Sequence, residues 1–215
     1  PEPELHLNVL RRIGGNYVRC TMSSRDTGDL WPFERIGDHY DLEQPSAAYW
    51  QRFSQFLQMT YEPAMVIQIE VWATFDFYRD AWFLNPFNPK NNSNYTAQES
   101  GLPIEVQSPP TQTENPFFFT VPEEQGNDLV LSYQQRFVDR LLSRALPYSH
   151  VLYCIDNETS VTPAWGAYWA RYIKKKAEGR GLDVVITEMW DAHDLSDPQH
   201  AHTIDHSELY DYVDI

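Results

Sequence analysis

The carboxyl group of Glu158 lies in the segment whose pattern is most suggestive of chemistry. This segment, Cys-Ile-Asp-Asn-Glu-Thr-Ser over 154–160, follows a predicted buried strand, so the strand would hold the acid rigidly at its end. A partly desolvated carboxyl in such a place has a raised pKa and can protonate a leaving oxygen, as glycoside cleavage requires. Asn157 beside it could hydrogen-bond a sugar hydroxyl. The same residues could instead cap the following helix, and both interpretations stay open at this point.

Other predicted strand ends carry further polar and aromatic side chains. Glu188 follows a short apolar run and could be a second carboxylate, a substrate contact or a structural acid. Glu70 and Trp72 end another run, where an acid could bind hydroxyl groups and an indole could stack on a sugar, although core packing explains Trp72 almost as well. Arg19 and Arg25 flank the end of the first run; we prefer Arg19 as a site residue, with a surface ion pair as its alternative.

The segment 190–206 contains four His among several Asp. Imidazole and carboxylate groups can bind metals, but the spacing matches no familiar zinc pattern. We therefore expect no metal and no cofactor. Trp190 and His193 are expected to contact substrate, and His193 is the histidine expected to face a cleft.

Strand-like and helix-like runs alternate along the chain, which predicts a parallel sheet with helices outside. Within 12–22 a turn on Gly14 and Gly15 is expected to lead into a short strand. Further strands are expected over 64–72, 150–155, 182–187 and from 210 onward, and helices over 46–59, 128–145 and 162–179. The polar stretch 23–44 is expected to be a loop, and 73–125 a long, ordered, aromatic-rich loop. The carboxyl ends of parallel strands meet at one edge, where they would gather the candidate side chains. No Gly-rich phosphate loop follows a strand, which disfavours nucleotide binding.

Composition narrows the function further. The 215 residues are enough for one domain, and they are 42% hydrophobic and 14% aromatic, so the aromatic rings could fill a core, line a cleft or do both. The net charge of −15 disfavours nucleic acids and suits a neutral glycan. No apolar stretch is long enough to span a membrane. Cys20 and Cys154 are expected to be buried free thiols.

Four segments together resemble clan A glycoside hydrolases and, within them, uncharacterised cellulase-like barrel proteins of bacteria. They are 14–26 (GGNYVRCTMSSRD), 85–92 (NPFNPKNN), 153–160 (YCIDNETS) and 187–191 (TEMWD). The resemblance implies an α/β fold, a (β/α)8 TIM barrel, with about strands two to six in a single partial catalytic domain over 1–215. It also implies retaining hydrolysis of a β-linked glycan, with Glu158 as the acid/base at the end of the fourth strand.

The resemblance has consequences for the rest of the site. It implies that Arg19 orients the nucleophile, which in this clan is a Glu at the end of the seventh strand. No residue here matches that Glu, so we expect it beyond residue 215. An oligo- or polysaccharide partner and a secreted or periplasmic location are also implied. Two other functions remain: a non-catalytic carbohydrate-binding barrel, and a metal-dependent hydrolase using the loop from His193 to His206. The sequence does not indicate which sugar is bound, which linkage is cleaved, or whether cleavage is endo or exo.

Overall fold

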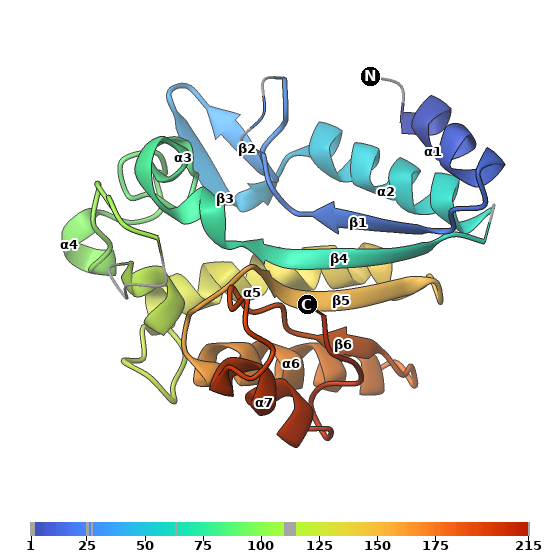
Figure 1. Ribbon diagram of the computed structural model, residues 1–215. Coiled ribbons are helices and arrows are strands. Elements are labelled where there is room, and N and C mark those ends of the chain that lie inside the picture. The colour runs from blue at the N-terminus through green and yellow to red at the C-terminus, as the bar shows by residue number, and fades with distance from the viewer. Residues whose placement is uncertain (1–2, 25, 27, 63, 110–114, 215) are drawn as a thin grey trace.

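The computed structural model describes residues 3–24, 26, 28–62, 64–109 and 115–214 (Figure 1). Four parallel strands form its central sheet in the order β1-β4-β5-β6, and β2 and β3 form a separate antiparallel hairpin. The prediction of an α/β fold with a parallel sheet is therefore confirmed. The elements are α1 (Pro3–Arg12), β1 (Tyr17–Thr21), β2 (Phe33–Ile36), β3 (His39–Pro45), α2 (Ala47–Tyr61), β4 (Val66–Ala73), the 3-10 helix η1 (Thr74–Phe77), α3 (Arg79–Leu84), α4 (Ala97–Ser100), the 3-10 helix η3 (Pro116–Phe119), α5 (Asp128–Ala145), β5 (Val151–Asn157), α6 (Pro163–Glu178), β6 (Val185–Thr187) and α7 (Pro198–Asp205).

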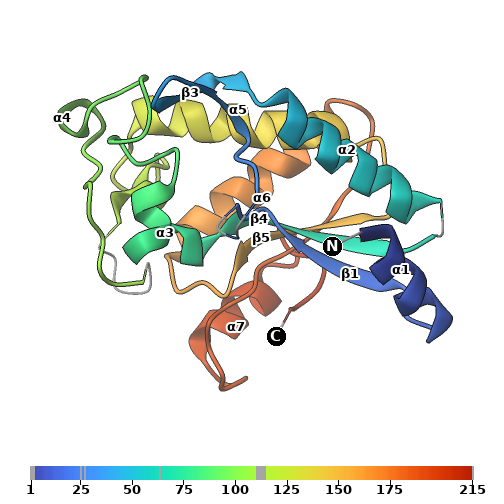
Figure 2. The same ribbon diagram turned by 90° about the horizontal axis from the view of Figure 1, so that it is seen from above.

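Helices α2, α5 and α6 cover one face of the sheet (Figure 2). Each begins where the sequence supplies a start signal. The side chain of Ser46 accepts a hydrogen bond from the backbone N–H of Tyr49 at the start of α2, and Asn127 caps Val130 in the same way at the start of α5. Pro163 occupies the first turn of α6, where its missing N–H costs nothing. These three helices fall where the apolar periodicity predicts them.

Several segments differ from the sequence predictions. The segment 73–125, expected to be a loop, contains the short helices η1, α3, α4 and η3, and the sequence does not predict α1. The stretch 23–44, expected to be a loop, contains β2 and most of β3, whose largely exposed residues lack the alternation that reveals a half-buried strand. The His-rich loop contains α7, which buries only His200 and Thr203 and so carries no apolar stripe. The strand expected from 210 onward is reduced, among the described residues, to one parallel bridge between Met189 and Asp214.

The abundant aromatic residues fill the core for the most part. All Trp residues except Trp31 are buried, and Trp72 of β4 lies at the centre of the helix-covered side. Its ring centroid is 5.3 Å from that of Phe137 on α5 and 5.2 Å from that of Trp169 on α6. Such tilted and edge-to-face pairs add about 0.5–1.5 kcal/mol each beyond their burial. Core packing, one of the two roles expected for the aromatic residues, therefore accounts for most of the Trp residues.

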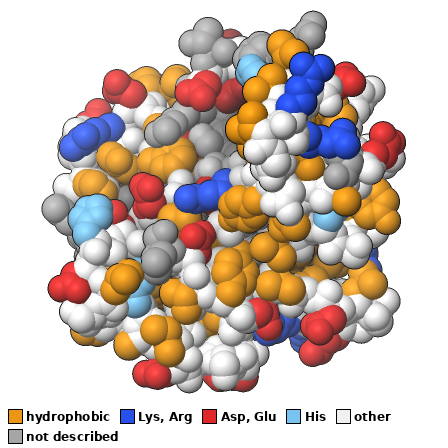
Figure 3. Space-filling model, turned by 45° about the vertical axis from the view of Figure 1, so that its right-hand side comes forward, with side chains coloured by type: hydrophobic (Ala, Val, Ile, Leu, Met, Phe, Trp, Pro, Cys, Tyr) orange, Lys and Arg blue, Asp and Glu red, His pale blue; other side chains and the backbone are white. Residues whose placement is uncertain are grey.

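Strand β1 lies at an edge of the sheet and pairs only with β4 among the described strands. Nearby apolar side chains are exposed, including Leu5, Val9 and Ile13 on or just after α1 and Tyr17 on β1. Figure 3 shows one face of the molecule, on which hydrophobic side chains are exposed in clusters between acidic and basic ones. The described strands thus form an open parallel sheet, which is consistent with part of a barrel.

Two expectations from composition concern thiols and membranes. Cys20 and Cys154 are both free, and Cys154 is buried whereas Cys20 is half-buried. Among the described helices, none combines the length and the apolar character that a membrane-spanning helix needs.

The two N-caps provide a matched test of helix capping. Asn127 caps α5 and its amide also donates to the backbone oxygen of Ser100 at 2.7 Å, whereas Thr162 makes no capping hydrogen bond with its side chain at α6. We expect Asn127→Ala to lower the free energy of unfolding by about 0.5–2 kcal/mol. Thr162→Ala should change it by less than about 0.5 kcal/mol. Denaturant unfolding measures both, and equal losses would contradict the assignment.

Candidate active site

Glu158 directly follows β5 and is exposed, while its neighbours Asn157 and Thr159 are buried. Its φ of 48° lies in the left-handed region, which costs a residue other than glycine roughly 1–3 kcal/mol and requires support from the surrounding structure. The hydroxyl of Thr74, after β4, donates to the backbone oxygen of Asn157 at 2.6 Å. The chain beyond β5 therefore turns sharply at Glu158, which directs this side chain outward.

The backbone after Glu158 is joined to the chain that follows β6. The N–H of Thr159 donates to the carbonyl of Met189 at 2.9 Å, and the N–H of Asp191 donates to the carbonyl of Thr159 at 2.8 Å. These bonds form a parallel bridge between Thr159 and Trp190. Glu158 thus stands between two anchors, Thr74 on the β4 side and the Thr159–Trp190 bridge on the β6 side.

A pocket of about 110 Å³ opens beside Glu158. Its lining combines two acids, three hydroxyl-bearing residues and two apolar ones: Glu158, Asp191, Thr74, Ser160, Tyr78, Phe75 and Pro109. Asp191 is exposed like Glu158 and comes from the neighbouring strand end. Carboxylates and hydroxyls next to aromatic rings are the groups that bind a sugar's hydroxyls and its apolar face. From the sequence we assign no role to Asp191, although it belongs to the segment 187–191.

Arg19 and Glu70 form an ion pair on the face of the sheet opposite α2, α5 and α6. The Nε and Nη2 atoms of Arg19 each lie 2.5 Å from Oε1 of Glu70, and the hydroxyl of Thr21 donates to Oε2. Glu70 is 1% exposed, so both of its oxygens are engaged inside the protein. The structure therefore places Glu70 as the partner that holds Arg19, whereas the Arg19 side chain remains 41% exposed.

Met189 joins this ion pair to the end of β5. Its sulfur lies 3.1 Å from Nη2 of Arg19 and 3.7 Å from Nδ2 of Asn157. Arg19, Glu70 and Asn157 are therefore brought together on three neighbouring strands, Arg19 and Glu70 from the middle of β1 and β4 and Asn157 from the end of β5. Arg25, the other candidate arginine, lies outside the described residues.

Trp72 does not lie on the same side of the sheet as Glu70. We predict from the sequence that it contacts substrate, and its position in the core corrects that prediction. It is 2% exposed and packs against Phe137 and Trp169 on the helix-covered side. The β4–β5 register pairs Glu70 with Cys154 and Trp72 with Asp156, without a pair between Val71 and Ile155. The register is the same on both sides of this missing pair, so a shift between the strands does not explain why Trp72 lies on the helix-covered side.

Glu188 also departs from its expected role as a substrate contact. It is 0% exposed, and its Oε1 accepts a hydrogen bond of 2.9 Å from the backbone N–H of Asp156 on β5. Burial raises the pKa of the Glu188 carboxyl, and the neighbouring Asp156 raises it further. Of the alternatives open for Glu188, the structure places it as an internal, structural acid. Asp156, to which the sequence pattern gives no role, is buried beside it.

The two remaining candidates lie away from the pocket beside Glu158. Trp190 is 3% exposed, and its indole N–H donates to the hydroxyl of Thr203 on α7 at 2.8 Å, so it packs against α7 and does not line this pocket. His193 is exposed in the segment before α7 and does not line the pocket. Within the described part of the chain, no three His, Cys, Asp or Glu side chains gather in a way that could hold a metal ion.

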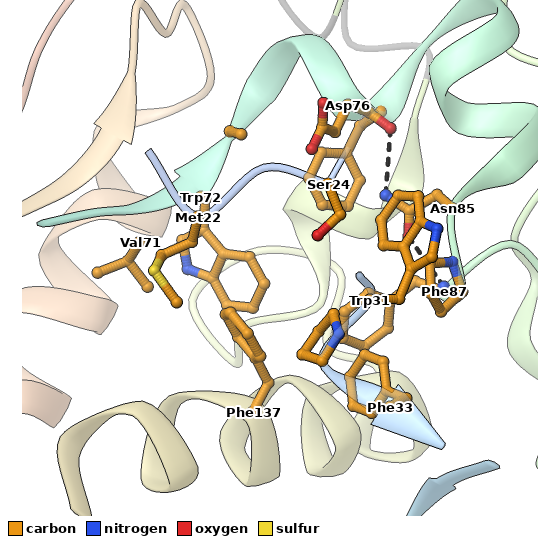
Figure 4. A pocket seen from close by; sticks show the side chains of 14 residues that line it. Met22, Ser24, Trp31, Phe33, Val71, Trp72, Asp76, Asn85, Phe87 and Phe137 are labelled. Atoms are coloured by element: carbon orange, nitrogen blue, oxygen red, sulfur yellow. Dashed lines mark hydrogen bonds between the residues drawn. The ribbon is translucent and has the colours of Figure 1, made fainter. Parts of the chain in front are cut away.

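A second cavity lies near the ends of β1 and β4 (Figure 4). Aromatic rings line it together with three polar side chains: Trp31, Phe33, Trp72, Phe87, Phe137, Ser24, Asp76 and Asn85. The amide of Asn85 donates to the backbone oxygen of Asp76 at 3.1 Å. With a volume of about 30 Å³ the cavity has space for roughly two water molecules. It is therefore too small to hold a sugar ring, despite its suitable chemistry.

The sequence matches no protein-family model and no curated protein. Its fold is similar to that of a glycoside hydrolase family 5 mannosidase from Rhizomucor miehei, with a TM-score of 0.57 and 13% identity over 98% of this chain and 50% of that one. A mutant of that mannosidase in complex with mannosyl-fructose gives 0.58 and 12%, with the same coverage of both chains.

An endo-1,4-beta-mannanase from the same organism is also similar, with a TM-score of 0.52 and 10% identity over 90% of this chain and 54% of that one. This chain therefore spans about half the length of these proteins. At such low identity the similarity shows the fold alone. It agrees with a parallel α/β arrangement that forms part of a barrel.

Trp72 allows a test of core packing against substrate contact. We expect Trp72→Ala to lower the free energy of unfolding by about 3–5 kcal/mol, because it empties the centre of the aromatic core. Trp31→Ala is the matched control, since the half-buried Trp31 lines the same small cavity and should cost about 1 kcal/mol. Thermal or denaturant unfolding distinguishes them. A Trp72→Ala variant of unchanged stability would contradict the core position of Trp72.

Proposed function

We propose that this chain carries the acid/base half of a glycoside hydrolase site, in which Glu158 protonates the glycosidic oxygen of a β-linked glycan. The observation that carries this proposal is an exposed glutamate carboxyl, held directly after β5, beside a pocket lined by hydroxyl groups and aromatic rings. Glu70 within β4 and Glu188 directly after β6 are buried and engaged. Asp191 is exposed at the same pocket, and the resemblance of the segment 153–160 to clan A enzymes favours Glu158 over it as the acid/base.

In the proposed reaction Glu158 first acts as an acid and then as a base. It donates its proton to the leaving oxygen while a second carboxylate attacks the anomeric carbon, and it then removes a proton from the water that releases the sugar. A retaining site places the two carboxyl groups about 5–5.5 Å apart. We assign no nucleophile within these 215 residues and propose that it belongs to a further strand, as the resemblance to clan A enzymes implies.

The substrate we propose is a neutral β-linked glycan, with β-mannosides tested first and β-glucans second. The structurally similar proteins include a mannosidase and a mannanase, and the sequence resembles cellulase-like proteins. The net charge of −15 would repel an acidic polysaccharide. Asn157 is proposed to hydrogen-bond a hydroxyl of the sugar next to the scissile bond, and Arg19 to orient the nucleophile.

The dependence of rate on the leaving group tests the role of Glu158. In the full-length protein, Glu158→Gln should lower turnover of glycosides with poor leaving groups by about 10²–10⁴-fold, because general acid catalysis contributes that much. Formation of the glycosyl-enzyme from a dinitrophenyl glycoside, whose leaving group needs no proton, should be nearly unaffected. Steady-state and burst kinetics on the two classes of aryl glycoside measure this difference.

Asp191→Asn is the matched control, because Asp191 lines the same pocket. It should keep the wild-type dependence on leaving group even if it weakens substrate binding. Equal losses on both substrate classes for Glu158→Gln, or no loss on either, would remove Glu158 from the acid/base role. A wild-type protein that binds oligosaccharides in calorimetry but turns over none would instead favour a carbohydrate-binding function, the main alternative.

A further inference from the structure

Asp156 and Glu188 form a buried pair of carboxyl groups between the sheet and α6. Both residues are 0% exposed, and they come from neighbouring strand ends. Oε1 of Glu188 accepts the backbone N–H of Asp156 at 2.9 Å, and Oδ2 of Asp156 accepts the indole N–H of Trp165 at 3.0 Å. One oxygen of each carboxyl group is thus accounted for by a neutral donor.

The remaining two oxygens, Oδ1 of Asp156 and Oε2 of Glu188, are buried without a hydrogen-bond donor. Within the described part of the chain, neither acid forms an ion pair with Lys, Arg or His. The titratable groups facing the pair are Cys154 on β5 and Tyr210 from the C-terminal segment, and neither is a cation. The guanidinium of Arg171 on α6 pairs with Glu123 at 2.9 Å instead.

Two adjacent carboxylates without a buried cation cannot both be ionised at low cost. Burial raises the pKa of each group, and for Glu188 the charge of Asp156 adds to the effect. A single proton held between Oδ1 of Asp156 and Oε2 of Glu188 would give each oxygen its missing partner. Carboxyl pairs that share one proton in this way are known where two acids occupy one site.

The local sequence of α6 makes room for this pair. A methyl group placed on Gly166 would lie 2.3 Å from Oε2 of Glu188 and 3.1 Å from the hydroxyl of Tyr210. Glycine in the interior of a helix is otherwise unfavourable by about 1 kcal/mol relative to alanine. The absence of a side chain at this position is therefore what lets the Glu188 carboxyl reach its place under α6.

We propose that Asp156 and Glu188 share one proton and act together as a positioning pair for the Asn157–Glu158 turn. Asp156 immediately precedes this turn, and its backbone is tied to Glu188. Glu188 in turn precedes Met189, whose carbonyl accepts the N–H of Thr159 on the far side of Glu158. The pair thus fixes the chain on both sides of Glu158. The effect of this pair on turnover rests on the function proposed above. The claim that the two acids share a proton is independent of that function.

The dependence of stability on pH tests the shared proton. The unfolded chain releases this proton above about pH 4.3 while the folded chain keeps it, so wild-type stability falls as pH rises from there toward the raised folded pKa. Glu188→Gln supplies a permanent N–H donor in place of the proton and removes this dependence. The folding equilibrium constant of Glu188→Gln relative to wild type should therefore rise by about 100-fold between pH 5 and pH 7.

The exposed Glu178 at the end of α6 provides a matched control. Glu178→Gln should give a ratio to wild type that does not change between pH 5 and pH 7. If the folding equilibrium constant of Glu188→Gln relative to wild type also stays constant between pH 5 and pH 7, the proposal of a shared proton is overturned. Gly166→Ala gives an independent check, because it should destabilise the fold despite the better helix propensity of alanine, and it should do so less when Glu188 is also changed to Ala.

Kinetics separate positioning from a merely structural role. Glu188→Gln should keep kcat within about threefold of wild type, whereas Glu188→Leu, which removes the acceptor for the Asp156 N–H, should lower kcat by about 10–100-fold with a smaller change in KM. Equal kcat values for the two variants would overturn positioning. If Glu158→Gln has no effect on turnover while the pH dependence follows the prediction, the proposed function fails and the proton-sharing pair stands.

Discussion

Two backbone hydrogen bonds tie the chain after β5 to the chain after β6, and the arrangement of the candidate site depends on them. The N–H of Thr159 and the N–H of Asp191 each find a carbonyl on the opposite segment at 2.9 and 2.8 Å. Glu158 sits directly before this bridge, in a left-handed conformation that the local sequence alone would not favour. The bridge and Thr74 overcome this cost, and the carboxyl group consequently has a defined direction at the edge of the sheet.

The same edge carries several acids, and their surroundings give them different roles. Glu70 is held by Arg19 and Thr21, and Glu188 is held under α6 beside Asp156. Both oxygens of Glu70 are engaged, whereas Glu188 and Asp156 each keep one buried oxygen without a donor, which the proposed shared proton would satisfy. Glu158 differs because the strand ends just before it and the turn exposes its side chain. The proposed chemistry follows from this contrast, since an acid/base must reach its substrate.

The sequence predicts the elements with strong apolar patterns better than the directions of individual side chains. Strand β4 and helix α5 are recognisable because burial is continuous in one and periodic in the other. The β2–β3 hairpin and α7 bury too little to leave such a pattern. Trp72 lies on the helix-covered side, where it packs against Phe137 and Trp169, although simple alternation from Glu70 predicts the other side. Glu188 could face either side of the sheet, and a glycine on α6 decides the outcome.

Chemical rescue of Glu158→Ala in the full-length protein tests the central claim most directly. Without the general base, the glycosyl-enzyme formed from a dinitrophenyl β-glycoside should accumulate, and azide, which needs no deprotonation, should attack it. We predict that azide restores turnover and that the product is a glycosyl azide of the same anomeric configuration as the substrate. Absence of rescue, or the same rescue in an Asp191→Ala variant, would contradict the assignment of Glu158.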